Sequence, residues 1–216
     1  MVYLLGVDDA GRGPVIGPMV LAGVLINEEK ENLLKKIGVK DSKKLFSSAR
    51  ERIKEILEKE VEYFLQVISP REIDSSPNLN TLEAERMAVI INKLSLEKKE
   101  KIKVFVDCPS NNKIKWGFLL KSLLLRKDME LFIEHKADIN FPVVSAASIL
   151  AKEKREEEIK KLKKDFKKDF GSGYPSDPKT ISFIKNNFKD DKFKEIIRFS
   201  WESIKRLSDE KQKKLF

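Results

Sequence analysis

The chain has 216 residues, and its 44 lysines and arginines against 35 acidic residues give a formal charge of +9. One cysteine and one histidine exclude an internal disulfide, a CxxC metal knuckle and any site built from several histidines. A metal site would therefore use carboxylates, which favours Mg²⁺ or Mn²⁺ as the ion.

No stretch approaches the roughly 20 apolar residues that a membrane helix needs. Residues 1–9 lack the basic start of a signal peptide. We therefore expect a cytoplasmic protein with no membrane partner. The abundance of Lys and Glu indicates growth at high temperature, and the basic surplus is compatible with a nucleic-acid partner.

The first predicted element is a strand over residues 2–7, an apolar run that ends abruptly at Asp8 and Asp9. Residues 10–18 contain Gly and Pro at a density typical of tight turns, and residues 19–26 predict a second strand. The two strands together predict a hairpin with an elaborate connection.

The rest of the chain alternates predicted helices and strands. Apolar spacing predicts helices over residues 27–37, from Ser47 or Ser48 to 57, over 81–94 with Asn80 as the N-cap, over 116–125 and over 143–166. Strands are predicted over residues 61–68, 102–107 and 131–133. A turn cluster at 171–178 precedes two or three short helical segments. This pattern predicts an α/β domain over residues 1–170 and a helical C-terminal segment over residues 171–216.

Four aspartates follow apolar segments: Asp8, Asp9, Asp107 and Asp138. Strand ends are where ligand sites gather in α/β sheets, and carboxylates that meet there repel one another unless cations neutralise them. Two divalent ions would do so and would suit phosphodiester cleavage. The alternative for each acid is an ordinary turn residue or helix cap, and spacing alone does not bring the four together.

Residues 11–14, Gly-Arg-Gly-Pro, invite comparison with phosphate-binding loops. They lack the Gly-Lys-Ser/Thr ending of a P-loop and do not match GxGxxG. Glycines let a backbone approach a sugar or phosphate closely, but the pattern alone favours a simple tight turn.

These pieces occur together in an order that resembles the ribonuclease HII family, the type 2 ribonucleases H, in its archaeal form. Its motifs are matched, in order, by residues 8–18, 40–45, 106–107, 135–148 and 171–178. The resemblance runs from Val2 to about residue 206. It implies a ribonuclease H-like fold, a five-stranded mixed sheet flanked by helices, with a helical C-terminal part that grips the duplex.

The resemblance also implies an activity and its partners. Members cleave RNA in RNA/DNA hybrids and incise duplex DNA at embedded ribonucleotides, leaving 3′-hydroxyl and 5′-phosphate ends. The implied cofactor is a pair of Mg²⁺ or Mn²⁺ ions held by the four aspartates. A monomer is expected.

Substrate contacts are implied residue by residue. Gly11, Arg12 and Gly13 match the loop that recognises the ribose 2′-OH, and Tyr174 matches the tyrosine that stacks on the sugar 3′ of the ribonucleotide. Ser42 and Lys43 match phosphate-holding positions. Two residues of the fourth motif, His135 and Lys136, are candidates for phosphate or product contact, although a structural imidazole is the favoured alternative for His135.

One position departs from the family pattern, in which Glu follows the first Asp. Here Asp9 is one methylene shorter, so its carboxylate reaches less far toward a second metal. This substitution leaves open a second function, a protein that binds RNA–DNA junctions and cleaves them weakly or not at all. A junction resolvase of the same fold is disfavoured, because the Gly-Arg-Gly loop and Tyr174 are ribonucleotide-reading features.

The C-terminal residues 211–216, Lys-Gln-Lys-Lys-Leu-Phe, resemble the start of a sliding-clamp-binding peptide. The fuller pattern is Gln-x-x-Leu followed by an aromatic pair, and the second aromatic is missing here. Clamp binding is a hypothesis that deletion of residues 212–216 would test.

Overall fold

The computed structural model describes residues 1–39 and 47–206. By their contacts the residues form two compact units. The first unit comprises Met1–Ala10, Val20–Gln66 and Asn78–Lys154, and the second comprises Gly11–Met19, Val67–Pro77 and Arg155–Phe216. The division of the chain into domains at residue 170 stays a prediction.

The sheet contains five strands in the order β3-β2-β1-β4-β5. Their bounds are β1 Val2–Ala10, β2 Met19–Asn27, β3 Glu62–Ile68, β4 Lys101–Asp107 and β5 Glu130–Glu134. β1 pairs antiparallel with β2 and parallel with β4, and β4 pairs parallel with β5. The predicted five-stranded mixed sheet and the predicted hairpin are therefore confirmed.

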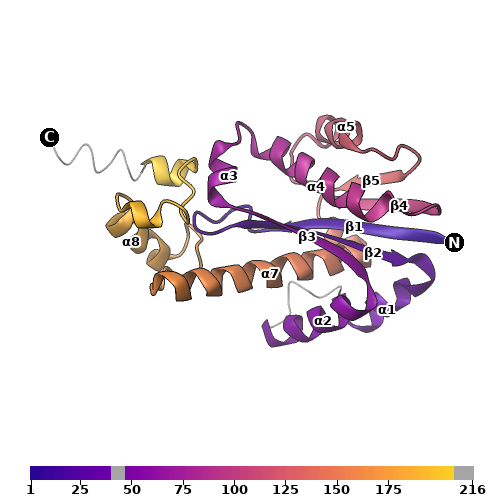
Figure 1. The fold of residues 1–216 in the computed structure, drawn as a ribbon, viewed down its shortest axis with the longest axis horizontal. Coiled ribbons are helices and arrows are strands. Elements are labelled where there is room, and N and C mark those ends of the chain that lie inside the picture. Colours follow the sequence, from indigo (N-terminus) through magenta and orange to yellow (C-terminus); the bar gives the residue numbers. More distant parts are fainter. Residues whose placement is uncertain (40–46, 207–216) are drawn as a thin grey trace. The chain divides into compact units, whose positions relative to one another are not determined.

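Helices cover both faces of the sheet in the first unit. The helical elements are η1 Glu28–Lys30, α1 Glu31–Lys36, α2 Ser47–Glu60, α3 Pro70–Ser75, α4 Leu79–Ser95, α5 Lys113–Leu123, α6 Ala137–Asn140, α7 Pro142–Phe166, α8 Pro178–Asn187 and η3 Asp191–Phe193. α4 and α5 lie on one face, and α1, α2 and the start of α7 lie on the other (Figure 1). Among the described residues, no helix combines the length and apolarity needed to cross a membrane.

The structure corrects several predicted boundaries. The helix predicted over residues 27–37 is divided into η1 and α1, with the Asn27 side chain capping the first. α4 begins two residues earlier than predicted, because the side chain of Asn78, not Asn80, accepts hydrogen bonds from the first-turn N–H groups. The short helices α3 and α6 were not predicted, since four to six residues are too few for a clear apolar period.

The first strand also runs further than predicted. Asp8 and Asp9 lie inside β1, opposite Ala22 and Leu21 of β2, instead of following the strand. The pairing with an almost wholly buried β2 keeps the backbone extended past the point where the apolar run stops. Both acids are therefore held by sheet hydrogen bonding.

The core of the first unit depends on a close approach of β1 and α7. A Cβ on Gly6 would stand 2.4 Å from the carbonyl carbon and oxygen of Val143 and 2.6 Å from the amide nitrogen of Val144. The small and branched residues at the start of α7, from Val143 to Ala151, are almost fully buried. The start of α7 therefore packs closely on the sheet.

The second unit has its own apolar cluster. Ile16 and Ile197 form an isolated β-bridge, which joins residues 11–19 to the C-terminal segment. The buried members of the cluster are Val15, Ile16, Ile159, Phe170, Phe183, Ile184, Phe193, Ile196, Ile197 and Ile204.

We expect Gly6→Ala to lower the free energy of unfolding by about 1–3 kcal/mol, because a methyl group there meets backbone that cannot rotate away. Gly117→Ala is the matched control. Its Cβ would stand 2.9 Å from Cδ1 of Ile133, a side chain that can rotate, and alanine favours the helix by up to about 1 kcal/mol. Urea unfolding of both variants measures this difference. Equal effects would contradict the close-packing argument.

Candidate active site

The predicted acids lie on three neighbouring elements of the first unit. Asp8 and Asp9 are on β1, Asp107 is the last residue of β4, and Asp138 is on α6, directly after β5. β1 and β4 are adjacent and parallel, and Val7 lies opposite Val106, so Asp8 and Asp107 are the next residues along the two strands. Asp8 and Asp138 are each only 5% exposed.

Asp8 is the most strongly perturbed of these acids. Burial raises its pKa well above the ordinary value, and the nearby charges of Asp9 and Asp107 raise it further. A hydrogen bond with the Ser148 hydroxyl and one from the Asp9 amide, 2.8 Å from Oδ1, act in the opposite direction. The folded protein therefore disfavours ionisation of Asp8, and a neighbouring cation would favour the ionised form.

Backbone contacts hold Asp107 and Asp138 in place. Oδ1 of Asp107 accepts a hydrogen bond of 2.7 Å from the amide of Ala137, the residue before Asp138. The Ser145 hydroxyl donates to the carbonyl oxygen of Asp138. The segment after β5 is therefore tied to β4 through Ala137 and to α7 through Asp138, which fixes the position of Asp138 in the first turn of α6.

The four acids match a divalent cation in donor type and in charge. Carboxylate oxygens are the ligands that Mg²⁺ and Mn²⁺ prefer, and burial, followed by the charges of Asp9 and Asp107, raises the pKa of Asp8. Within residues 1–39 and 47–206, however, no three His, Cys, Asp or Glu side chains are grouped closely enough to hold a metal ion. Successive strand residues point to opposite faces, so the side chains of Asp8 and Asp9 leave β1 on different sides.

Ser148 is a contact that the sequence did not reveal. Its position among alanines favours close packing, and it is 1% exposed, as a packing residue would be. The structure adds the hydrogen bond with Asp8. The only signal in the sequence is the place of Ser148 on the face of α7 that packs on β1. A serine buried on that face needs a polar partner, and few polar groups lie nearby.

His135 and Lys136, the two candidate phosphate contacts of the fourth motif, lie at the surface of the first unit. His135 is exposed, and its Nδ1 lies 3.2 Å from the carbonyl oxygen of Cys108. That contact accords with the structural alternative for His135. Lys136 is exposed, has a left-handed backbone with φ of 57°, and occupies the N-cap position of α6. Ser42 and Lys43 lie outside the described residues.

In the second unit, residues 11–13 form a loop that we call the glycine loop. Arg198, which is fully buried, donates from Nη1 to the carbonyl oxygen of Arg12 at 3.1 Å and from Nε to that of Gly17 at 2.9 Å. Trp201 Nε1 donates to the carbonyl oxygen of Gly13 at 3.3 Å. These anchors fix the peptide planes of the loop, and no local pattern around Arg198 or Trp201 predicts them.

The segment that contains Tyr174 is joined to the same loop. The amides of Val15 and Ile16 both donate to the carbonyl oxygen of Gly173, at 2.7 and 3.2 Å. The Tyr174 side chain is 41% exposed, and Cζ of Arg155 lies 5.4 Å from its ring centroid. Two sequence motifs more than 150 residues apart thus form one surface of the second unit.

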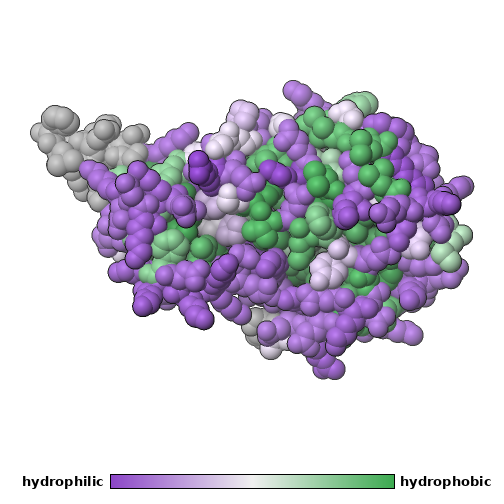
Figure 2. Space-filling view, viewed as in Figure 1, coloured by the Kyte–Doolittle hydropathy of each residue, from purple (hydrophilic) through white to green (hydrophobic). Residues whose placement is uncertain are grey.

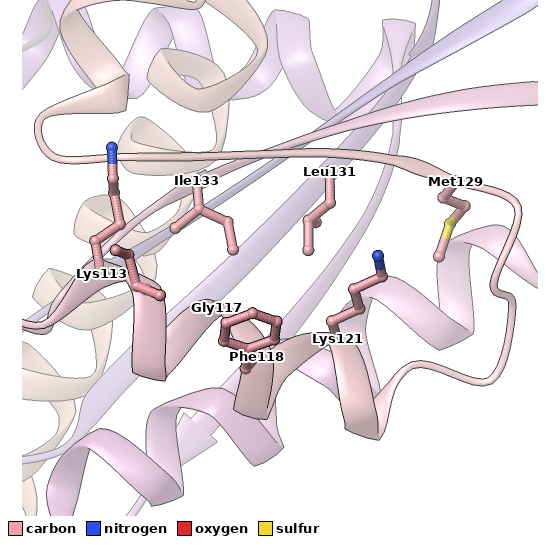
Figure 3. A pocket seen from close by; sticks show the side chains of 8 residues that line it. Lys113, Gly117, Phe118, Lys121, Met129, Leu131 and Ile133 are labelled. Atoms are coloured by element: carbon pink, nitrogen blue, oxygen red, sulfur yellow. The ribbon is translucent and has the colours of Figure 1, made fainter.

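A pocket of about 380 Å³ lies between α5 and β5, away from the predicted residues (Figure 3). Its lining residues are Lys113, Ile114, Gly117, Phe118, Lys121, Met129, Leu131 and Ile133. Ile114 and Phe118 are each 72% exposed, and apolar groups reach the surface in the part of Figure 2 where α4 and α5 lie. None of the lining residues is acidic, so this pocket is not where the four acids lie.

The five-stranded mixed sheet and the acids on its strands are those of a ribonuclease H-like fold. Comparison with known proteins identifies the family. A family model described as Ribonuclease HII matches residues 5–204. The Ribonuclease HII of Pyrococcus furiosus is 41% identical over 207 residues, which cover 94% of this chain and 90% of the relative. The chain therefore belongs to the ribonuclease HII family and is a hydrolase. Membership implies an endoribonuclease that acts on RNA/DNA hybrids.

Solved structures agree with this assignment. The crystal structure of the ribonuclease H2 from Pyrococcus horikoshii OT3 superposes with a TM-score of 0.87 at 39% identity, covering 98% of this chain and 99% of that one. The RNase HII of a PCNA:RNase HII complex from Archaeoglobus fulgidus gives a TM-score of 0.81 at 37% identity, with 93% and 95% coverage. The predicted fold class is confirmed.

We expect Asp8→Asn to raise the free energy of unfolding at neutral pH in EDTA. The unfolded Asp8 loses its proton near pH 3.8, whereas the folded group resists ionisation, so wild-type stability falls as the pH rises above that value. The advantage of the variant should shrink as the pH is lowered toward 3.8. Denaturant unfolding between about pH 5 and about pH 8 measures the difference in free energy of unfolding between the variant and wild type.

Asp177→Asn should show the opposite sign and serves as the control. Hydrogen bonds, chiefly from the backbone of Ser172, lower the pKa of Asp177 to about 2. Its charged form stabilises the fold above the unfolded pKa, so the variant should be less stable than wild type at neutral pH. An Asp8→Asn variant that loses stability in the same way would contradict the charge-burial argument.

Proposed function

We propose that this protein cleaves the RNA strand of RNA/DNA hybrids and incises duplex DNA on the 5′ side of an embedded ribonucleotide. The products carry 3′-hydroxyl and 5′-phosphate ends. The observation that supports this most directly is the burial of the Asp8 carboxylate beside Asp9 and Asp107, with its pKa raised. A fold that buries a charge without its own cation is suited to a reaction that brings cations to that position.

The proposed cofactor is a pair of Mg²⁺ or Mn²⁺ ions held by Asp8, Asp9, Asp107 and Asp138. Such ions supply an activated water and stabilise the charge that develops on the leaving 3′ oxygen. The chain's own groups set the positions of the acids. Ser148 and the Asp9 amide orient Asp8, and the Ala137 amide holds one oxygen of Asp107.

Recognition of the ribonucleotide itself is assigned to the second unit. In this proposal the backbone of Gly11, Arg12 and Gly13 meets the ribose 2′-OH, the group that distinguishes RNA from DNA. Tyr174 stacks on the sugar 3′ of the ribonucleotide. Its exposed ring and the anchored carbonyl groups of the loop support these roles. Ser42, Lys43, His135 and Lys136 are proposed to contact backbone phosphates.

A labelled DNA duplex with one ribonucleotide tests this function. Incubation with Mg²⁺, Mn²⁺ or EDTA should give metal-dependent incision 5′ of the ribonucleotide. Asp107→Asn should slow it by at least about 100-fold, because a metal-binding charge is lost. The matched control is Asp165→Asn, the same change at an exposed position of α7, which should leave the rate unchanged.

Asp9→Glu belongs in the same assay. A longer carboxylate should increase the rate in Mg²⁺ by several-fold if the short side chain limits metal binding. Selective, tight binding of the duplex without incision in either metal would support the alternative, a junction-binding protein. Incision that persists in EDTA would contradict the proposed two-metal reaction.

We also propose that residues 212–216 contribute to binding a sliding clamp. These residues lie outside the described part of the chain, and the support is their sequence pattern together with the PCNA complex of the Archaeoglobus fulgidus relative. Deleting residues 212–216 should weaken clamp binding at least about 10-fold, because a short peptide would supply most of the contact. Incision of a free duplex should be unchanged. Calorimetry with the clamp measures the first effect, and unchanged clamp affinity would exclude the tail.

A further inference from the structure

Arg155 is a buried cation with unusual surroundings in the second unit. It lies on α7 with 8% of its surface exposed, and burial lowers its pKa. Among the described residues, its Nε and Nη2 atoms have no hydrogen-bond acceptor. A buried charged group without partners reduces stability, so packing alone does not account for an arginine at this position.

Three neighbours of Arg155 belong to the proposed recognition surface: Gly11, Gly173 and Tyr174. A Cβ on Gly11 would stand 2.3 Å from its Cδ and 2.4 Å from its Nε, so the side chain lies flat against the glycine loop. Its Nη2 would be 3.6 Å from a Cβ on Gly173. Its guanidinium faces the ring of Tyr174 at 5.4 Å. One side chain thus lies against the loop, near Gly173 and over the Tyr174 ring.

The chemistry of arginine fits this position. The guanidinium is planar and permanently charged, so it stacks on an aromatic ring and resists neutralisation by burial. The two donors without acceptors, Nε and Nη2, belong to the same edge of the guanidinium. A lysine has a compact charge and no plane, so it can neither lie against Gly11 nor face the ring in the same way.

We propose that Arg155 is a positioning residue for ribonucleotide recognition, holding the Tyr174 ring against the glycine loop so that the two act as one reading surface. The proposal rests on the recognition role assigned above to Tyr174 and the loop. In this proposal Arg155 acts through Tyr174, and its two donors without acceptors, Nε and Nη2, are buried and so do not reach a phosphate. Its loss therefore reduces discrimination between a ribonucleotide and a deoxyribonucleotide, and leaves general affinity for duplex DNA intact.

A double-mutant cycle tests this in a binding assay that needs no cleavage. Fluorescence anisotropy in EDTA compares two duplexes that differ only in one ribonucleotide. The variants are Arg155→Met, Tyr174→Leu and the double variant. Tyr174→Phe keeps the ring, and Lys160→Met changes an exposed cation on the same helix.

We expect wild type to prefer the ribonucleotide duplex and Arg155→Met to reduce that preference about 10-fold. Tyr174→Leu should do the same, and the double variant should be no worse than either single variant, because coupled residues are not additive. Lys160→Met should retain the full preference, and Tyr174→Phe should retain most of it. Affinity for the all-DNA duplex and its dependence on salt should be unchanged in Arg155→Met.

Three results would overturn the role of Arg155. Additive losses in the double variant would show that it does not act through Tyr174. A shallower salt dependence on both duplexes would make it a direct phosphate contact. Equal losses of affinity for both duplexes, matched by a lower melting temperature, would make it structural.

A substitute variant and a wild-type control complete the experiment. If Arg155→Met does not fold, Arg155→Lys retains a charge and a long stem, and the same cycle with it should still lose preference, because the plane is absent. A wild-type protein that neither incises the ribonucleotide duplex nor prefers it would contradict the proposed function, and the role of Arg155 with it. Incision and preference by wild type with additive variants would overturn the role of Arg155 alone.

Discussion

The structure of the first unit depends on a carboxylate held where water cannot easily stabilise it. Asp8 lies inside a strand that is paired on both sides and covered by α7, and neighbouring acids increase the cost of ionising it. Such an arrangement persists only if the surrounding packing is strong. The close contact between Gly6 and the start of α7 provides that packing two residues away on the same strand. Stability and charge burial are therefore coupled at the centre of the sheet.

In the second unit, contacts from distant residues hold the glycine loop in one conformation. Glycines leave the backbone free, so order has to be imposed by contacts from elsewhere in the chain. Arg198 and Trp201 bind the carbonyl groups of Arg12 and Gly13, and the Gly173 carbonyl binds the amides that follow the loop. All of these partners come from the C-terminal part of the sequence. The helical C-terminal segment is thus needed to shape the loop, apart from any contact with a duplex.

Much of the architecture could be predicted from local patterns. Apolar runs, together with alternation at residues 61–68, identified all five strands, and the helical period at residues 143–166 identified α7 almost to the residue. Weak signals failed where elements were short. α6 has four residues, and its start is defined by a left-handed Lys136 and a bond from Ala137 to Asp107 that no local pattern contains. The N-cap of α4 was misplaced because Asn78 and Asn80 are chemically equivalent candidates and only geometry selects between them.

For the site, the sequence by itself determined which residue types were present and in which order. One histidine and one cysteine left carboxylates as the only metal donors, and the ordered motifs indicated the family. Only the tertiary structure decided how those residues are supported, because support comes from residues far apart in the chain. The hydrogen bond between Ser148 and Asp8, the anchors from Arg198 and the stack of Arg155 on Tyr174 all depend on folding, which brings together side chains whose own neighbours in sequence show no sign of the contact.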